Sequence, residues 1–279
     1  MRKLTSLQKS RHHLTTAIIL VIFCFPLYWA IINSIKMPLE TFAGSWVPFL
    51  QFKPTLVNWA KELGDQSTRR ALANSTIVSL CSTGIVLFIG TLAAFSLAVF
   101  KFEKLKNQDI IIWFLSQRVM PPVIFIVPFF LLMRSLKLID SLYALILVNV
   151  TFVLPFAVII MREIFRGIPG ELIDAALVDG ASYWQIFRKV ALPLASGGLV
   201  ATGIICLAIV WNEFIFALSL SYDRAVVMPV VIAGSEHTRG VEFWYIGVRV
   251  LLTMSLPVVV ALFAQRYLVK GLTLGAVKG

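Results

Sequence analysis

Charged residues are scarce in this chain of 279 residues. Only 14% of the residues are Asp, Glu, Lys or Arg, whereas 59% are hydrophobic. A soluble globular domain carries about 25% charged residues. The composition therefore excludes a water-soluble fold and predicts a chain that crosses a membrane several times.

Acidic residues are the scarcer of the charged residues, which leaves a net charge of +11. Such an excess of positive charge can indicate a nucleic-acid partner. Here the Lys and Arg residues cluster just outside apolar runs, where they set the orientation of a membrane protein. We therefore expect the lipid bilayer, and no nucleic acid, around this chain.

The residue groups that support catalysis are also missing from the apolar runs. Cys24, Cys81 and Cys206 lie within these runs without metal or disulfide spacing, which is typical of small buried residues. The three histidines lie outside the runs, so no intramembrane Ser–His pair is available. No Gly-rich phosphate loop ending in Gly-Lys-Ser/Thr occurs. We expect no catalytic residue, no metal site and no cofactor bound by this chain.

Six apolar runs are long enough to cross a bilayer, which takes about 20 mostly apolar residues in a helix. The six predicted spans are Leu14–Ile35, Ser75–Phe100, Ile110–Met133, Leu142–Met161, Leu194–Leu218 and Ile246–Arg266. The predicted fold is an all-α polytopic membrane protein with six transmembrane helices. No internal repeat, low-complexity tract or linker divides the chain, so a single domain over residues 1–279 is expected.

The distribution of Lys and Arg predicts the orientation of these spans. More of them fall in the N-terminal tail, in 101–106, in 162–189 and after the last span than in the other connections. Since basic loops stay inside, both termini are expected to be cytoplasmic. The first apolar run exceeds the roughly 7–15 residues of a signal peptide and lacks a small-x-small cleavage site, which favours an uncleaved span.

Two connections on the outer side are long enough to contact another protein. They are Lys36–Asn74, which carries Trp46 and Trp59, and Ser219–Tyr245, which contains a charged stretch at 236–239. Each either contacts an external partner or only connects spans.

The polar island, residues Arg166–Pro193, separates the fourth and fifth spans. Gly167 and Pro169 end the preceding helix, and a second helix is expected to follow them. Gly180 permits a sharp turn. Ser182 and Gln185 have the spacing of a capping box that begins another short helix. The sequence predicts a cytoplasmic two-helix element, and its exposed aromatics favour docking to a protein over a simple amphipathic connector.

The spacing within the polar island resembles a known signature. The polar island contains Asp174-Ala175-Ala176, then three residues and Gly180, then nine residues and Val190-x-Leu192-Pro193. This order matches E-A-A-x3-G-x9-I-x-L-P, with Asp for Glu and Val for Ile. This is the EAA motif of bacterial ABC-importer permeases. The carbohydrate-uptake, maltose-permease-like branch is indicated by further segments: 117–122, Leu138-Ile139-Asp140, Trp211–Phe214 and Gly271–Gly279.

The resemblance implies a permease subunit of an ATP-driven importer in the bacterial inner membrane, and no enzyme activity of its own. It implies a second permease subunit, a homodimer of ATPase subunits that use ATP and Mg, and an external solute-binding protein that delivers a sugar. The polar island is then a coupling loop to the ATPase. Its expected coupling residues are Asp174, Ala175, Ala176, Gly180, Tyr183, Trp184, Phe187, Leu192 and Pro193.

Polar residues within the predicted spans are candidates for the sugar pathway, because such groups are costly in lipid. They are Gln117, Arg118, Asn149, Thr151, Trp211, Asn212 and Glu213. An equal alternative is that they join helices to one another, including an Arg–Glu pair. Arg249 near the end of the sixth span belongs to the same set of polar residues. A polyol or another small polar solute is an alternative substrate. An ion-coupled secondary transporter is a different alternative, although it leaves the polar island unexplained.

Overall fold

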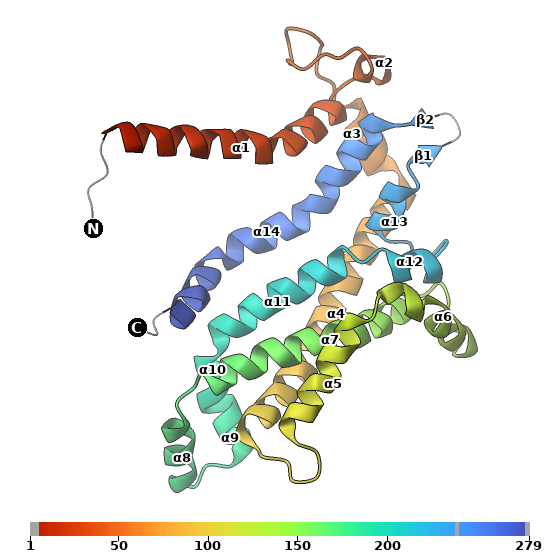
Figure 1. Cartoon of the computed structure of the whole chain (residues 1–279). Helices are drawn as coiled ribbons and strands as arrows, with labels where there is room; N and C mark the ends of the chain where they lie inside the picture. The colour runs from red at the N-terminus through yellow and green to blue at the C-terminus, as the bar shows by residue number, and fades with distance from the viewer. Residues whose placement is uncertain (1–5, 238–239, 277–279) are drawn as a thin grey trace. The chain divides into compact units, whose positions relative to one another are not determined.

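The computed structural model describes residues 6–237 and 240–276. Within them the regular structure is helical, apart from two short antiparallel strands of two residues each (Figure 1). The longer helices are α1 Ser6–Ser34, α3 Val57–Gly64, α4 Gln66–Val99, α5 Asn107–Val119, α6 Ile126–Ser135, α7 Leu142–Arg166, α8 Gly170–Val178, α11 Ser196–Trp211 and α14 Phe243–Ala276. The short elements are α2 Pro38–Thr41, η1 Pro122–Phe125, α9 Tyr183–Ile186, η2 Phe187–Ala191, α10 Leu192–Leu194, α12 Ile215–Leu220, α13 Met228–Ala233, β1 Glu236–His237 and β2 Gly240–Val241.

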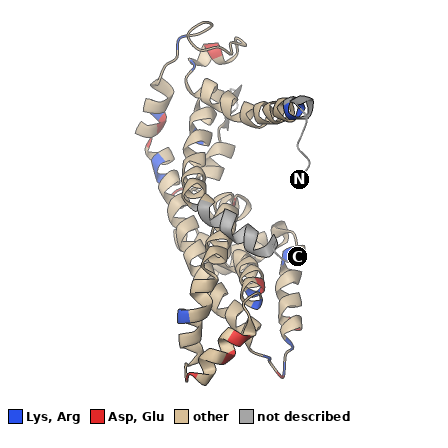
Figure 2. Cartoon of the chain, turned by 90° about the vertical axis from the view of Figure 1, so that its left-hand side faces the viewer, with Lys and Arg blue, Asp and Glu red and all other residues tan. Residues whose placement is uncertain are grey.

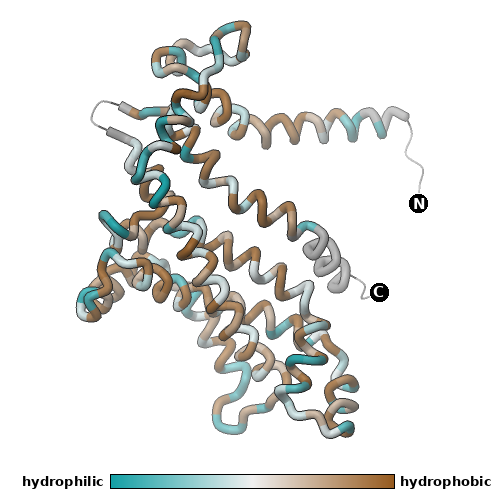
Figure 3. The backbone as a smooth tube through the Cα atoms, turned by 180° about the vertical axis from the view of Figure 1, so that it is seen from behind, coloured by the Kyte–Doolittle hydropathy of each residue, from teal (hydrophilic) through white to brown (hydrophobic). Residues whose placement is uncertain are grey.

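The predicted helical membrane fold is confirmed. Among the described residues, four helices are long and apolar enough to cross a membrane, and two bent helix pairs raise the number to six if each pair is one span. Figure 3 shows the hydrophobic colour along these helices, and Figure 2 shows most charged residues near helix ends and in connections. Val277–Gly279, the end of the C-terminal run used for the family resemblance, lies outside the described residues.

Two predicted spans are not the straight helices that the apolar runs suggested. The third breaks at Met120–Pro121, where α5 and the following helix are bent by 92°. Both residues before the two prolines have extended backbone, with ψ of 129° and 132°, because a proline disfavours the helical conformation of its predecessor. The fifth is bent by 77° before Ser196, and its helix ends at Trp211, well before Leu218.

The described residues form two compact units. Unit 1 combines Met1–Arg69 with Val231–Ser255, and unit 2 combines Arg70–Val230 with Leu256–Gly279. The expectation of a single domain over residues 1–279 stays a prediction.

In unit 1, α1 and α14 approach each other closely at Gly247. A Cβ atom at this position would lie 2.7 Å from the carbonyl oxygen of Ala30. The end of α1 is capped by Asn58, whose side chain donates to the carbonyls of Ser34 and Lys36 at 3.1 and 2.7 Å. Unit 1 thus joins the connection that follows α1 to its helices through satisfied backbone groups.

In unit 2, α7 is the central helix, and two hydrophobic clusters lie along it. One contains Val148 and Val153 of α7 with Phe216 of α12. The other contains Met161 and Phe165 and reaches the polar island. At Gly90, α4 lies so close to α7 that a Cβ atom would be 2.8 Å from that of Ala157. The second cluster therefore fixes the polar island to the membrane helices.

Candidate functional site

The first half of the polar island is a helix that ends in a glycine-dependent turn. Pro169 has extended backbone and precedes α8. At its other end Gly180 has φ of +78°. The N–H of Ala181 donates to Ala176 O and that of Gly180 to Leu177 O, both at 3.0 Å. This is a Schellman motif, in which glycine avoids the steric cost of the left-handed conformation.

The second half begins with the predicted capping box. The Ser182 hydroxyl accepts from the N–H of Gln185 at 3.3 Å, and the Gln185 carbonyl oxygen accepts from the N–H of Ser182 at 2.7 Å. The α9 helix widens into the π-helical turn η2, and α10 then leads to the bend before Ser196. Pro193 lies in α10, where its missing N–H contributes to the irregular hydrogen bonding.

Two of the three aromatics of the polar island, Tyr183 and Phe187, contact the rest of the chain. Phe187 is 6% exposed and packs against Phe95 at 5.2 Å between ring centroids. Tyr183 contacts Phe100 at 4.6 Å, and Trp184 stacks on Phe187 at 5.4 Å. The expectation that these aromatics fill a groove of another protein is therefore wrong for Phe187, whose surface is already buried by α4 and α7.

One face of α8, formed by Leu172, Ala175 and Val178, is an exposed apolar surface of the polar island. Val178 is 87% exposed. Ile173 and Ala176 pack against the hydrophobic cluster that contains Met161 and Phe165. Sequence reasoning missed Leu172 and Val178, although the three-residue spacing of these apolar side chains on a helix indicates one face.

The remaining predicted coupling residues lie around this face. Asp174 is exposed on α8 and has no ion pair within the described part of the chain. Leu192 is half-buried against the hydrophobic cluster that contains Met161 and Phe165, and Pro193 is exposed.

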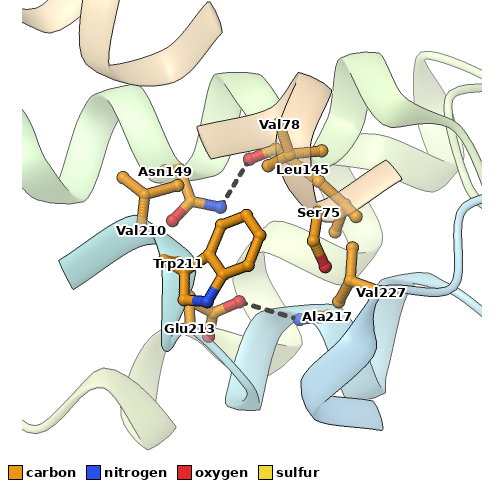
Figure 4. A pocket seen from close by; sticks show the side chains of 9 residues that line it. All are labelled: Ser75, Val78, Leu145, Asn149, Val210, Trp211, Glu213, Ala217 and Val227. Carbon is orange, nitrogen blue, oxygen red and sulfur yellow. Dashed lines mark hydrogen bonds between the residues drawn. The ribbon is translucent and has the colours of Figure 1, made fainter. Parts of the chain in front are cut away.

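The candidate pathway residues separate onto two sides of α7. Asn149 and Thr151 are two residues apart on this helix and therefore point in nearly opposite directions. Asn149 lines an enclosed pocket with Ser75, Trp211 and Glu213, as Figure 4 shows. This pocket holds about 10 Å³ of free space, which is enough for about one water molecule and far too little for a sugar.

The polar groups of this pocket already have partners. The Asn149 amide donates to Leu145 O at 2.9 Å. The Glu213 carboxylate accepts from the backbone N–H groups of Phe216 and Ala217 at 2.7 and 3.1 Å, and so caps the start of α12. In this structure these residues join elements of unit 2, which agrees with the alternative of internal contacts between helices. Asn212 is exposed outside this pocket and donates to Ala208 O.

The other side of α7 carries an aromatic-lined hollow of about 110 Å³. It is lined by Gln117, Phe125, Phe129, Thr151 and Phe152. Arg118 lies beside it, because its guanidinium donates to Phe152 O at 3.1 Å and lies 3.8 Å from the Phe156 ring centroid. The structure thus brings Gln117, Arg118 and Thr151 together.

Arg249 takes its ion-pair partner from outside the predicted spans. Arg249 makes a bidentate pair with Glu62 of α3, at 2.7 and 3.0 Å. Thr68 donates to the same carboxylate, and Arg249 also donates to the Ser235 hydroxyl. Glu62 escaped prediction because it lies in a connection between predicted spans, where an exposed acid is the ordinary expectation.

Asp140 organises the outer end of unit 2. Its carboxylate accepts from the backbone N–H groups of residues 222–225 at 3.0 to 3.2 Å. Burial alone raises the pKa of Asp140, but these four hydrogen bonds outweigh it and lower the pKa below its ordinary value. Across the described residues, no cluster of three or more His, Cys, Asp or Glu could hold a metal ion.

Comparison with known proteins assigns a family to these features. Residues 87–274 match the family described as binding-protein-dependent transport system inner membrane component. The trehalose transport system permease protein SugB of Mycobacterium tuberculosis is 32% identical, covering 90% of this chain and 97% of its own. The sulfoquinovosyl glycerol transport system permease protein SmoH of Agrobacterium fabrum is 32% identical, covering 97% and 94%.

The fold also matches a solved structure. A chain of the bacterial ABC transporter involved in the import of the acidic polysaccharide alginate has a TM-score of 0.74 to this protein. It is 19% identical, and the match covers 96% of this chain and all of the other.

Proposed function

The chain belongs to the family of binding-protein-dependent transport inner membrane components, and from this premise we propose that it is the permease subunit of an ATP-driven importer of a sugar or sugar derivative. The matches to relatives named for trehalose and sulfoquinovosyl glycerol transport cover at least 90% of this chain and of each relative. This similarity supports a carbohydrate substrate. A polyol or another small polar solute is the alternative for the same architecture.

The observation that carries the coupling proposal is that one part of the polar island packs on the membrane helices while another part is exposed. Phe187 anchors the polar island on α4 and α7, while α8 presents Leu172, Ala175 and Val178 outward. An apolar face held on a rigid support can dock into a groove of a cytoplasmic ATPase and pass its motion to the membrane helices. In this proposal Asp174 and Gly180 shape the docking helix, and Phe187 transmits the motion.

The proposed assembly follows from an anchored polar island with an exposed docking helix. ATP and Mg act in a homodimer of ATPase subunits, and a second permease subunit, expected to be a different chain, completes the pathway. A periplasmic or extracellular solute-binding protein delivers the sugar to the outer side. The protein is then a multi-pass protein of the bacterial inner membrane, with both termini and the polar island in the cytoplasm.

The aromatic-lined hollow is the better candidate for a substrate contact on this chain. Sugar hydroxyls need hydrogen-bond partners, which Gln117 and Thr151 supply, and sugar rings pack against aromatic faces such as those of Phe125 and Phe129. The pocket of Asn149, Trp211 and Glu213 is closed in this structure and acts as a contact between helices.

The test is to purify the complex with its binding protein and to measure ATP hydrolysis with a panel of sugars and polyols. We expect one class of sugar to stimulate hydrolysis and to be taken up into proteoliposomes in an ATP-dependent manner. Stimulation by polyols alone would support the alternative substrate. Uptake driven by an ion gradient without ATP would refute the importer and support a secondary transporter.

A further inference from the structure

Unit 2 contains a second, larger hollow that the proposed function does not use. Its volume is about 310 Å³, and it lies between α4, α11 and the second half of the polar island. Leu87, Phe88 and Leu92 of α4 and Leu199 of α11 make most of its lining apolar. The size and lining are suited to a hydrocarbon chain.

One lining residue indicates that the hollow holds a ligand with a polar atom. Thr91 is 4% exposed, and its hydroxyl has no hydrogen-bond partner among the described residues. A helical Thr or Ser ordinarily donates to the carbonyl four residues earlier, as Thr76 and Ser96 of the same helix do. Since a buried unpaired hydroxyl is costly, an acceptor atom of a ligand in the hollow would give the Thr91 hydroxyl a favourable partner.

Another lining residue gives the hollow a positive charge. Arg188 lines it together with Trp184, which is 57% exposed, and Arg188 has no ion pair in the described part of the chain. Arg and Trp are the residues that anchor proteins at the membrane–water boundary. A guanidinium also matches the geometry of a phosphate group.

We propose that this hollow binds one phospholipid with an anionic head group. Its phosphate pairs with Arg188, an ester oxygen accepts a hydrogen bond from Thr91, and an acyl chain lies along Phe88, Leu92 and Leu199. Charge complementarity selects the occupant, since basic pockets between transmembrane helices on the cytoplasmic side bind anionic head groups. The lipid would bridge α4 and the polar island.

The chain offers a matched control for the charge. Lys189 is adjacent to Arg188 but lines a different hollow, which contains Asp179, Gly180 and Gln185. Lys189→Gln removes the same charge from the same turn without changing the proposed lipid site. Thr91→Val replaces the hydroxyl by a methyl group of similar volume.

The experiment measures lipid retained by the purified complete transporter in detergent, by native mass spectrometry. The probes are palmitoyl-oleoyl phosphatidylglycerol and the phosphatidylcholine with the same chains. Arg188→Gln is expected to lower retention of phosphatidylglycerol about tenfold, as loss of a charge-assisted hydrogen bond implies. It should lower retention of phosphatidylcholine less, because the choline ammonium already offsets the phosphate charge of that lipid. Thr91→Val is expected to lower retention of both lipids, because both carry the ester group.

Equal phosphatidylglycerol retention by wild type and Arg188→Gln would overturn the proposal, and this result is also expected if a partner's helix fills the hollow. An equal loss in Lys189→Gln would overturn it, since general charge would then explain binding. Displacement of the lipid by inorganic phosphate alone would indicate a free-anion site instead. Sugar-stimulated ATP hydrolysis in the same preparations separates failure of the lipid site from failure of the proposed function.

Discussion

A single carboxylate, that of Asp140, accepts hydrogen bonds from the four consecutive backbone N–H groups of residues 222–225. Asp140 itself has a positive φ of 57°, and its N–H donates to Leu220 O at 2.9 Å. Asn74 of α4 supports the same segment by donating to the carbonyls of Arg224 and Val226. The outer turn of unit 2 is therefore fixed by side chains that replace missing secondary structure.

Asp140→Asn should lower the free energy of unfolding of the purified protein by on the order of 2–3 kcal/mol at neutral pH. The loss should appear as a lower melting temperature. Because the folded pKa is lowered, the stabilisation is complete above the unfolded pKa of about 3.9 and is lost as pH falls through the folded pKa. The difference between wild type and variant should therefore shrink towards pH 3. Asp223→Asn, in the same turn, serves as the exposed control, and equal effects of the two variants would contradict the role of Asp140.

The Glu62–Arg249 pair is the second residue-scale determinant, and it lies within unit 1. Breaking a buried pair from one side costs about 3–5 kcal/mol, because a charge stays buried without its partner. We expect Glu62→Gln and Arg249→Gln each to lower the melting temperature strongly, and the double variant to lose less than their sum. Additive effects in this double-mutant cycle would refute direct coupling.

The control for this cycle is an exposed pair. Arg166 and Glu163 lie 3.6 Å apart with both side chains more than half exposed. Arg166→Gln should cost less than about 1 kcal/mol.

At the scale of elements, α8 combines one face packed on the membrane helices with one face free. Val178→Asp places a charge on the free face and should reduce co-purification of the ATPase subunit about tenfold or more, because a buried unpaired charge is costly at an interface. Leu39→Asp is the matched control, since Leu39 of α2 is 88% exposed but lies in the external connection. Undiminished co-purification with Val178→Asp would exclude α8 as the docking helix.

The turn after α8 gives a separate element-scale prediction. Gly180→Asp forces a side chain into a left-handed conformation, at a cost of roughly 1–2 kcal/mol, and should redirect the second half of the polar island. We expect sugar uptake to be uncoupled from ATP hydrolysis while the protein still inserts in the membrane. Gly170→Asp adds the same charge at the start of α8, where a Cβ atom meets nothing within 4 Å. Unchanged uptake in Gly180→Asp would exclude this role.

At the scale of the whole molecule, the orientation in the membrane is a prediction from charge distribution. A variant without Cys24, Cys81 and Cys206 allows single cysteines to be placed by Asp223→Cys and Asp179→Cys. A membrane-impermeant maleimide should label position 223 in intact cells and position 179 only after lysis. The opposite pattern would reverse the orientation and place the polar island outside.

The sequence by itself determined the helical membrane fold, the family and the local form of the polar island. These follow from contiguous signals: apolar runs of bilayer length, the capping box at Ser182 and the spacing around Gly180. Such features depend on residues within one or two helical turns of each other, so periodicity and turn chemistry reveal them.

Only the tertiary structure decided which side chains meet. It buried Phe187 in its own chain, paired Arg249 with Glu62, 187 residues away in sequence, and placed Asn149 and Thr151 on opposite sides of α7. Polar groups in a membrane protein take partners from whichever element folding brings near. Local sequence carries no signal for that choice, because the choice depends on helix packing and on helix breaks such as Met120–Pro122 and Trp211–Phe214.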